Sequence, residues 1–140
     1  MNRRGARRST ALLSVLLGTL PMVLGLGTSG GRDVLRPPLD FHATLTDRDG
    51  ITVDVSRINI GGDVQFEGDM GRGSLRVPFD NIASVDLSAD SADYSHAIVH
   101  LKTGDVVSLR VRNSLMIYGQ TGAGVFQIRA RDLQRIQFTS

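Results

Sequence analysis

The chain has no cysteine and no tryptophan, only three histidines, and few aromatic residues, which make up 5% of its 140 residues. Without cysteine it cannot form a disulfide scaffold, perform thiol catalysis, carry a cysteine-linked lipid anchor or build a cysteine-based zinc site. Three histidines leave little room for a histidine-rich metal site, so we predict no metal site and no cofactor. Hydrophobic residues make up 41% and charged residues 21%, which predicts a folded chain with a mainly aliphatic core.

The N-terminus has the order of a secretory signal. Four arginines within residues 3–8 precede an apolar run over residues 11–27, and small residues follow at 28–31. This order is typical of exported proteins. We therefore predict a signal helix over residues 1–27, cleavage at about 27–31, and a location in the periplasm, in the cell envelope or outside the cell. The alternative is an uncleaved anchor, which would be the only contact with a membrane, although the run is shorter than the ~20 residues that span a bilayer.

Removal of this segment would reverse the net charge. The whole chain carries +2, but residues 28–140 keep 12 basic and all 14 acidic residues, a net charge of −2. The positive charge of the whole chain is therefore no evidence for binding to nucleic acid. Together with the export signal, this predicts that the partner is not a nucleic acid.

The remainder of the chain has the pattern of β-strands. Residues 28–40 contain two Gly and two Pro without apolar periodicity, which predicts a flexible lead-in. From Phe41 onward apolar and polar residues alternate, as in half-buried strands, and Gly- and Asp-rich turns separate the alternating runs. We predict an all-β fold, a small barrel or sandwich, with residues 41–140 as a single domain.

Two segments of the chain resemble each other. Residues 73–88 align with residues 124–139 at a shift of 51, and their apolar positions coincide. The aligned pairs on which we base the next expectation are Val77 with Ile128 and Val85 with Ile136. A second, shorter likeness aligns Ile51–Arg57 with Val107–Asn113.

This alignment predicts an internal repeat of two related β-modules, 41–88 and 97–140, each with one short helical turn between strands. The linking residues, 88–95, are rich in Asp, Ser and Ala. The alternative is that two unrelated alternating strands align equally well by chance. About 45 residues bury too little surface alone, so two modules would have to share one core.

The repeated pattern "G-x-apolar-x-apolar-x-x-x-x-I-x-x-I-x-apolar" resembles small exported bacterial β-domain proteins of unknown function. Leu45–Val55 resembles the opening hairpin of Sm-like and SH3-like small barrels. The resemblance implies a fold pattern only. It implies no activity and no catalytic residues.

Three local patterns resemble parts of chemical sites, but each has a structural explanation that we prefer. Asp47 and Asp49 belong to a hairpin turn, because a calcium loop would need further oxygen ligands where a strand begins. His96 and His100 lie in a strand, where a spacing of four separates them by ~13 Å, so they are predicted to be surface imidazoles. The Gly-rich residues 119–124 precede a strand and not the helix that a phosphate loop requires.

Charge is distributed unevenly along the chain. Residues 28–96 have a net charge of −6, whereas residues 97–140 have a net charge of +4. In one interpretation the two halves neutralise each other, with Asp54 as the first candidate partner of Arg110. In the other, a basic face binds an anionic partner, because arginine binds carboxylates and phosphates with two parallel hydrogen bonds. The candidate binding residues are Arg110, Arg112, Arg129 and Arg131.

These observations favour a non-catalytic interaction or structural module of the bacterial cell envelope. Its partner would be an envelope protein, an anionic polymer or a lipid head group. One alternative is a small ligand-binding barrel, which would require an unfilled interior. The other is a small exported hydrolase, for which no Gly-x-Ser-x-Gly motif supplies a nucleophile.

Overall fold

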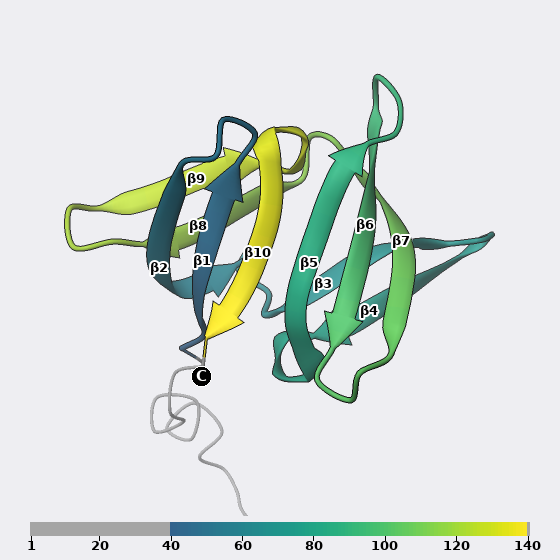
Figure 1. The fold of residues 1–140 in the computed structure, drawn as a ribbon, viewed down its shortest axis with the longest axis horizontal. Helices are drawn as coiled ribbons and strands as arrows, with labels where there is room; N and C mark the ends of the chain where they lie inside the picture. Colours follow the sequence, from purple (N-terminus) through teal and green to yellow (C-terminus); the bar gives the residue numbers. More distant parts are fainter. Residues whose placement is uncertain (1–39, 140) are drawn as a thin grey trace, which may run out of the picture. The chain divides into compact units, whose positions relative to one another are not determined.

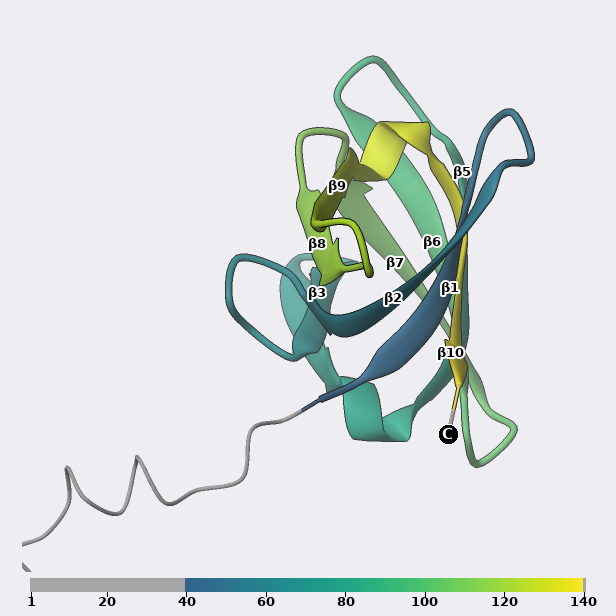
Figure 2. The ribbon, with the colours of Figure 1, turned by 90° about the vertical axis from the view of Figure 1, so that its left-hand side faces the viewer.

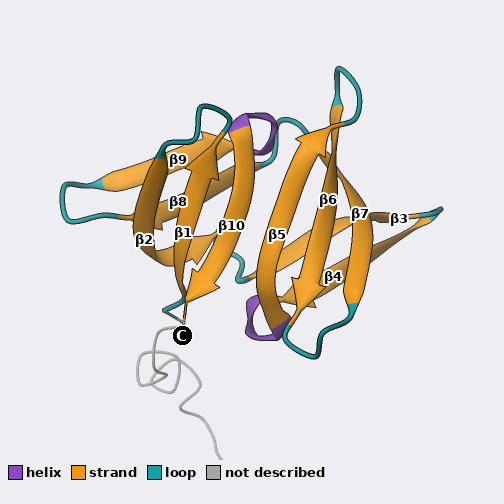
Figure 3. Ribbon diagram, viewed as in Figure 1, coloured by secondary structure: helices purple, strands orange, loops and turns teal. Residues whose placement is uncertain are grey.

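The structure, a computed structural model, describes residues 40–139, and strands account for most of them (Figure 1, Figure 3). Alternation explains the strands, because successive side chains of a strand point to opposite faces. In the first strand, for example, Ala43 and Leu45 are buried while their neighbours are not. The prediction of an all-β fold is confirmed.

The strands and the two short 3-10 turns follow one another along the chain. Their bounds are β1 (His42–Asp47), β2 (Thr52–Asn59), β3 (Gln65–Met70), β4 (Gly73–Pro78), η4 (Phe79–Asn81), β5 (Ile82–Ala89), β6 (Tyr94–Leu101), β7 (Val106–Arg112), β8 (Met116–Gln120), β9 (Val125–Arg129), η5 (Ala130–Asp132) and β10 (Leu133–Thr139). The two 3-10 turns lie where the alignment predicts short helical turns.

All ten strands belong to one antiparallel sheet, in the order β4-β3-β7-β6-β5-β10-β1-β2-β8-β9. β5 and β10 lie side by side at the centre of this order (Figure 1). The sheet curls away from this seam, so that β8 and β9 stand across from β1 and β10 (Figure 2). The fold is therefore a curled half-barrel sheet, with β4 and β9 as its two end strands.

The strand order is symmetric. If every strand from β1 to β5 is exchanged with the strand whose number is five higher, the order read from the opposite end of the sheet is unchanged. At the central seam Val85 pairs with Ile136, which lies 51 positions later in the sequence. The two flanking pairs, Ser84 with Gln137 and Asp86 with Arg135, are exchanged with each other by the same shift of 51. The two sequence halves are interleaved and not set side by side, since β6 and β7 lie between β5 on one side and β3 with β4 on the other.

The registers correct one part of the alignment. Leu45 faces the central residue of β10, and Val99 faces the central residue of β5. Their partners on the next strands, Val53 and Val107, therefore occupy corresponding places in the symmetric strand order, at a shift of 54. The sequence alignment had placed Ile51 opposite Val107, which is wrong by two residues. A slip of two keeps every side chain on the same face, so alternation alone does not detect it.

One hydrophobic cluster fills the interior of the sheet. It is mainly aliphatic, as predicted, and among the described residues Phe66 and Phe79 are the only aromatic members that are fully buried. Val85 and Ile136 are both completely inaccessible to solvent. The other aligned pair is less alike, because Val77 is buried whereas Ile128 is only half-buried.

Two glycines allow strands to approach closely at equivalent places. Gly68 lies in β3 and Gly119 in β8, again 51 residues apart. A Cβ atom on Gly119 would stand 2.5 Å from the Cβ of Val55, and one on Gly68 would stand 2.8 Å from the Cβ of Leu109. Any larger residue would collide at these positions, so the lack of a side chain is what allows this packing.

The start of the described region is fixed by Asp40. Its carboxylate accepts a hydrogen bond of 2.8 Å from the backbone N–H of Arg57, a residue with a left-handed φ of 51° at an irregularity in β2. This bond, helped by the neighbouring His42, holds the pKa of the Asp40 carboxyl below its usual value.

The predicted signal, its cleavage region and the rest of the lead-in lie outside the described residues. Within residues 40–139 there is no helix with the length and apolar composition needed to cross a membrane.

Candidate functional site: an arginine pocket

Three of the four candidate arginines line one pocket. Arg112 ends β7, Arg129 ends β9 and Arg131 lies in η5. The pocket has a volume of about 460 Å³, and we call it the arginine pocket. Its lining residues are Ala92, Asp93, Arg112, Asn113, Ser114, Arg129 and Arg131.

Backbone hydrogen bonds bring these distant segments together. The N–H of Ala130 donates to the carbonyl of Leu115 at 2.8 Å, and the N–H of Arg131 donates to the carbonyl of Asn113 at 3.3 Å. The turn η5 is thereby held against the segment that follows β7. Arg112 and Arg131 consequently line the same pocket, although 18 positions of sequence separate them.

Asn113 attaches the tip of the β5–β6 hairpin to the pocket. Its side-chain amide donates to the carbonyls of Ser91, at 3.1 Å, and Ala92, at 2.9 Å. Its backbone N–H donates to the carbonyl of Asp93 at 2.8 Å. The sequence analysis did not identify Asn113; the only signal in the sequence is an Asn directly after the Arg-rich strand.

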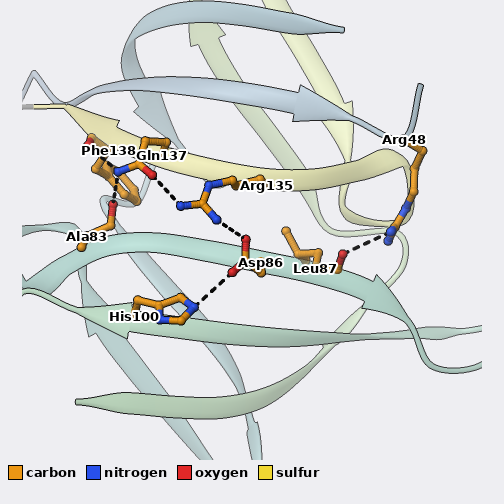
Figure 4. Close-up of polar contacts among 8 residues, drawn as sticks. All are labelled: Arg48, Ala83, Asp86, Leu87, His100, Arg135, Gln137 and Phe138. Atoms are coloured by element: carbon orange, nitrogen blue, oxygen red, sulfur yellow. Dashed lines mark hydrogen bonds and ion pairs between the residues drawn. The ribbon is translucent and has the colours of Figure 1, made fainter. Parts of the chain in front are cut away.

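Arg48 holds η5 from the other side. Its Nε donates to the carbonyl of Arg131 at 3.1 Å. One terminal nitrogen donates to the carbonyl of Leu87, also at 3.1 Å (Figure 4). Arg48 sits in the β1–β2 turn, where Asp47 accepts hydrogen bonds from two backbone N–H groups, as expected of a hairpin turn. The wall of the arginine pocket is thus fixed by three separate parts of the chain.

The pocket has an excess of positive charge. Within residues 40–139, Arg112 and Arg129 form no ion pair within 4.0 Å, and Arg131 pairs only with its neighbour Asp132, at 3.6 Å. Asp93 is the only acidic residue that lines the pocket. The lining of the pocket therefore holds three arginines and one acidic residue, with Asp132 beside Arg131 as a second carboxylate, and this excess of positive charge suits an anionic ligand.

The fourth candidate, Arg110, lies apart from this pocket. Its guanidinium carbon stands 3.9 Å from the centre of the Tyr94 ring, and its Nε lies 3.4 Å from Asp90. Asp54 is not its partner, because the Asp54 carboxylate accepts a hydrogen bond from Thr44 at 2.7 Å instead. With the shift of 54 the position that corresponds to Arg110 is Ser56, so the module correspondence does not lead to Asp90 either.

Arg110 and Arg112 also line a larger groove, of about 670 Å³. The acidic residues of this groove are Asp63, Glu67 and Asp69. With both signs of charge on its walls, the groove favours neither an anion nor a cation.

The histidines lie on the outer face of the central strands. His100 stands 3.1 Å from Asp86, which also accepts a hydrogen bond of 2.7 Å from Arg135 (Figure 4). His96 bonds to Ser108 and not to an acid. No Ser-His-Asp chain is formed by these contacts. His100 is therefore more than a surface imidazole, since it belongs to a polar network that joins β6, β5 and β10.

This network supports the neutralisation interpretation for part of the charge. Asp86 belongs to the acidic half of the sequence and Arg135 to the basic half, and Arg110 with Asp90 forms a second such pair. Arg112, Arg129 and Arg131 take no part in these pairs between the two halves. No cluster of three or more His, Asp or Glu residues able to hold a metal ion occurs in the region that the structure describes.

Comparison with known proteins places the domain in a family. Neither the curated proteins nor the solved structures contain a match to the chain. A family model with the description "Uncharacterised protein" matches residues 38–140, which include every strand of the sheet. The chain belongs to this family of uncharacterised proteins.

Proposed function

We propose that this protein is an exported, non-catalytic interaction module that binds an anionic group of its partner in the arginine pocket. The partner would be an envelope protein, an anionic polymer or a lipid head group. The observation that carries the proposal is the convergence of Arg112, Arg129 and Arg131, from three elements, around a pocket with one carboxylate.

A second observation supports a role for these arginines beyond folding. The equivalent positions of the other half, at the shift of 51, are Pro78 for Arg129 and Asp80 for Arg131. The strand and 3-10 turn at those positions form with Pro and Asp in one half and with Arg in the other. The turn itself therefore does not require arginine.

The proposal includes an internal duplication. The symmetric strand order, the shared shift of 51 at the seam and the paired glycines Gly68 and Gly119 support it. In each half of the sheet a 3-10 turn precedes the strand at the seam, which also fits a duplication. The resemblance of Leu45–Val55 to the opening hairpin of Sm-like and SH3-like small barrels remains, in this proposal, a resemblance of fold pattern.

Export is the remaining part of the proposal, and it rests on the signal-like order of residues 1–31. Expressed with its own N-terminus, the protein should be recovered outside the cytoplasm and shortened by about 27–31 residues. Fractionation followed by intact mass measurement tests this. Full-length protein in the cytosolic fraction would contradict it.

The pocket is tested by charge-matched variants. Arg112→Ser/Arg131→Ser removes two charges from the pocket, and Arg72→Ser/Arg76→Ser removes two exposed charges from the β3–β4 hairpin. On a dextran sulfate resin, the pocket variant should elute at lower salt, while the control elutes like the unaltered protein. Both should keep the melting temperature nearly unchanged, because exposed charges contribute only ~0–1 kcal/mol each.

Two results would contradict the proposal. An equal shift of both variants would mean that binding follows net charge and not the pocket. Unchanged elution of the pocket variant would mean that the arginines are merely solvated. Salt should weaken binding to the resin whether the pocket or the net charge is responsible, since the screening length falls to ~3 Å at 1 M.

A further inference from the structure

The end strand β9 has a free edge. It pairs with β8 only, and no other described strand lies beyond it. The register with β8 includes hydrogen bonds of Thr121 with Gly124 and of Leu115 with Ala130. In an antiparallel ladder such pairs alternate with pairs whose N–H and C=O groups point away. The outward-pointing backbone groups are therefore those of Val125, Gln127 and Arg129.

The equivalent edge, that of β4, is partly blocked. By the same register rule, its outward backbone groups belong to Ser74, Arg76 and Pro78, and proline has no N–H to donate. Proline on an edge strand is a common protection against pairing with another chain. At the position of Pro78 the β9 edge carries Arg129, which keeps its N–H group. Of the two symmetric edges, only that of β9 can therefore offer its full set of donors.

The side chains of β9 suit a partner strand as well. Val125 is 70% exposed, and Phe126 and Ile128 are half-buried, so an added strand would cover apolar surface. β9 contains no acidic residue, and it ends at Arg129 in the arginine pocket. An added strand that extends to Arg129 would therefore reach a residue that lines the arginine pocket.

We propose that β9 accepts an extended, acidic segment of a partner polypeptide as an eleventh strand of the sheet, with carboxylates of that segment in the arginine pocket. The inference rests on the proposed function of the pocket and names the class of partner. Backbone hydrogen bonds to Val125, Gln127 and Arg129 provide the pairing, as in known cases of strand addition. The arginines select an acidic segment over a neutral or basic one.

The experiment uses protein purified after expression of the full chain and a capped peptide, Glu-Val-Glu-Val-Glu-Val-Glu, whose charges lie on one face when it is extended. Two analogues carry N-methyl groups on all valines or on all glutamates, which leaves the charge unchanged. Because a peptide strand pairs through one edge, at least one analogue should bind at least tenfold more weakly than the parent. Hydrogen exchange should slow at Val125, Gln127 and Arg129 on binding, and not at Ser74 and Arg76.

A matched pair of variants tests the same point from the protein side. Gln127→Pro removes an outward N–H from β9, and Arg76→Pro makes the equivalent change in β4. The first should weaken peptide binding about tenfold and the second less than twofold. Binding of both N-methylated analogues as tightly as the parent, or protection at β4 in place of β9, would overturn strand addition; these measurements use the unaltered protein and do not depend on how a proline variant folds.

The arginine variant separates the two proposals. If Arg112→Ser/Arg131→Ser loses the peptide but the N-methylated analogues bind like the parent, the pocket stands and strand addition fails. If the analogues lose binding while the arginine variant keeps it, strand addition stands and the pocket fails. Binding of dextran sulfate without any binding of the peptide would show that the partner is a polymer and not a polypeptide, which would also overturn the inference.

Discussion

Replacing Gly119 with alanine tests the close packing of β8 against β2. The new Cβ would lie 2.5 Å from the Cβ and 2.7 Å from the Cγ2 of Val55, a residue that is 4% exposed. Val55 is β-branched and held in a strand, so it cannot rotate out of the way. Overpacking of this kind costs ~1–3 kcal/mol, against a gain of ~0.4–1 kcal/mol from the less flexible unfolded chain. We expect a net loss of about 1–2 kcal/mol.

The loss is measured by urea unfolding, with melting temperature as a second readout. For a domain of this size, it corresponds to a fall of roughly 5–15 °C. Gly122→Ala is the control, because Gly122 lies in the same hairpin, has nothing within 4 Å of an added Cβ and has no left-handed φ. The control should match the unaltered protein or exceed its stability slightly.

A double substitution shows whether the contact with Val55 is the cause. Val55→Ala alone should destabilise the protein, because it leaves a cavity. Gly119→Ala/Val55→Ala removes the two γ carbons that the added methyl group would approach at 2.7 and 3.0 Å and keeps only the contact with the Cβ at 2.5 Å, so the double variant should be more stable than the sum of the single effects predicts. Strictly additive effects, or a Gly119→Ala protein as stable as the control, would refute the reasoning.

The remaining predictions concern the hydrogen bonds of Arg48, the titration of Asp40 and the buried residues of the two central strands. Arg48→Ala should lose about 1 kcal/mol of unfolding free energy in urea, because two backbone carbonyls lose their donor; unchanged stability would mean that water replaces the side chain. Asp40→Asn should be less stable than the unaltered protein near neutral pH, because the lowered pKa of Asp40 means that its carboxylate stabilises the folded state; the difference should be lost as the pH falls from the unfolded pKa through the lower folded pKa, and a difference that persists below both values would contradict this. Val85→Ala and Ile136→Ala should each cost ~1–4 kcal/mol in chemical denaturation, since both are fully buried, and a near-zero cost for one of them would contradict their equivalence.

The strands could be predicted from the sequence because their signal is local. A strand with one buried face repeats its pattern every two residues, so β1 and its turn at Asp47 are readable without any knowledge of their neighbours. The 3-10 turns at η4 and η5 were also predicted, from the spacing of apolar residues after Val77 and Ile128. Neither required information about pairing.

Pairing between distant strands could not be predicted in the same way. An alternating strand fits several neighbours and several registers that differ by two residues, which is why Ile51 was aligned in place of Val53. The interleaving of the two halves has the same origin, because nothing in a single strand states which strand lies beside it. The close contact of Gly119 with Val55 follows from that pairing alone.

One part of the candidate site could likewise be predicted from the sequence, and another part could not. The sequence by itself determined that Arg110 and Arg112 point to the outer face, opposite the buried Leu109 and Val111, because alternation fixes the face of every side chain in a strand. Only the tertiary structure decided that Arg112 shares a pocket with Arg129 and Arg131 while Arg110 is paired elsewhere.

The physical reason is the range of the forces involved. Which face a side chain occupies depends on the dihedral angles of its own strand, and these are encoded within a few residues. Which charges meet depends on hydrogen bonds between residues far apart in sequence, such as those from Asn113 to the β5–β6 hairpin and from Arg48 to η5. Those bonds form only in the folded sheet. The sequence therefore determined which residues are charged, and the tertiary structure determined which charged residues lie close together.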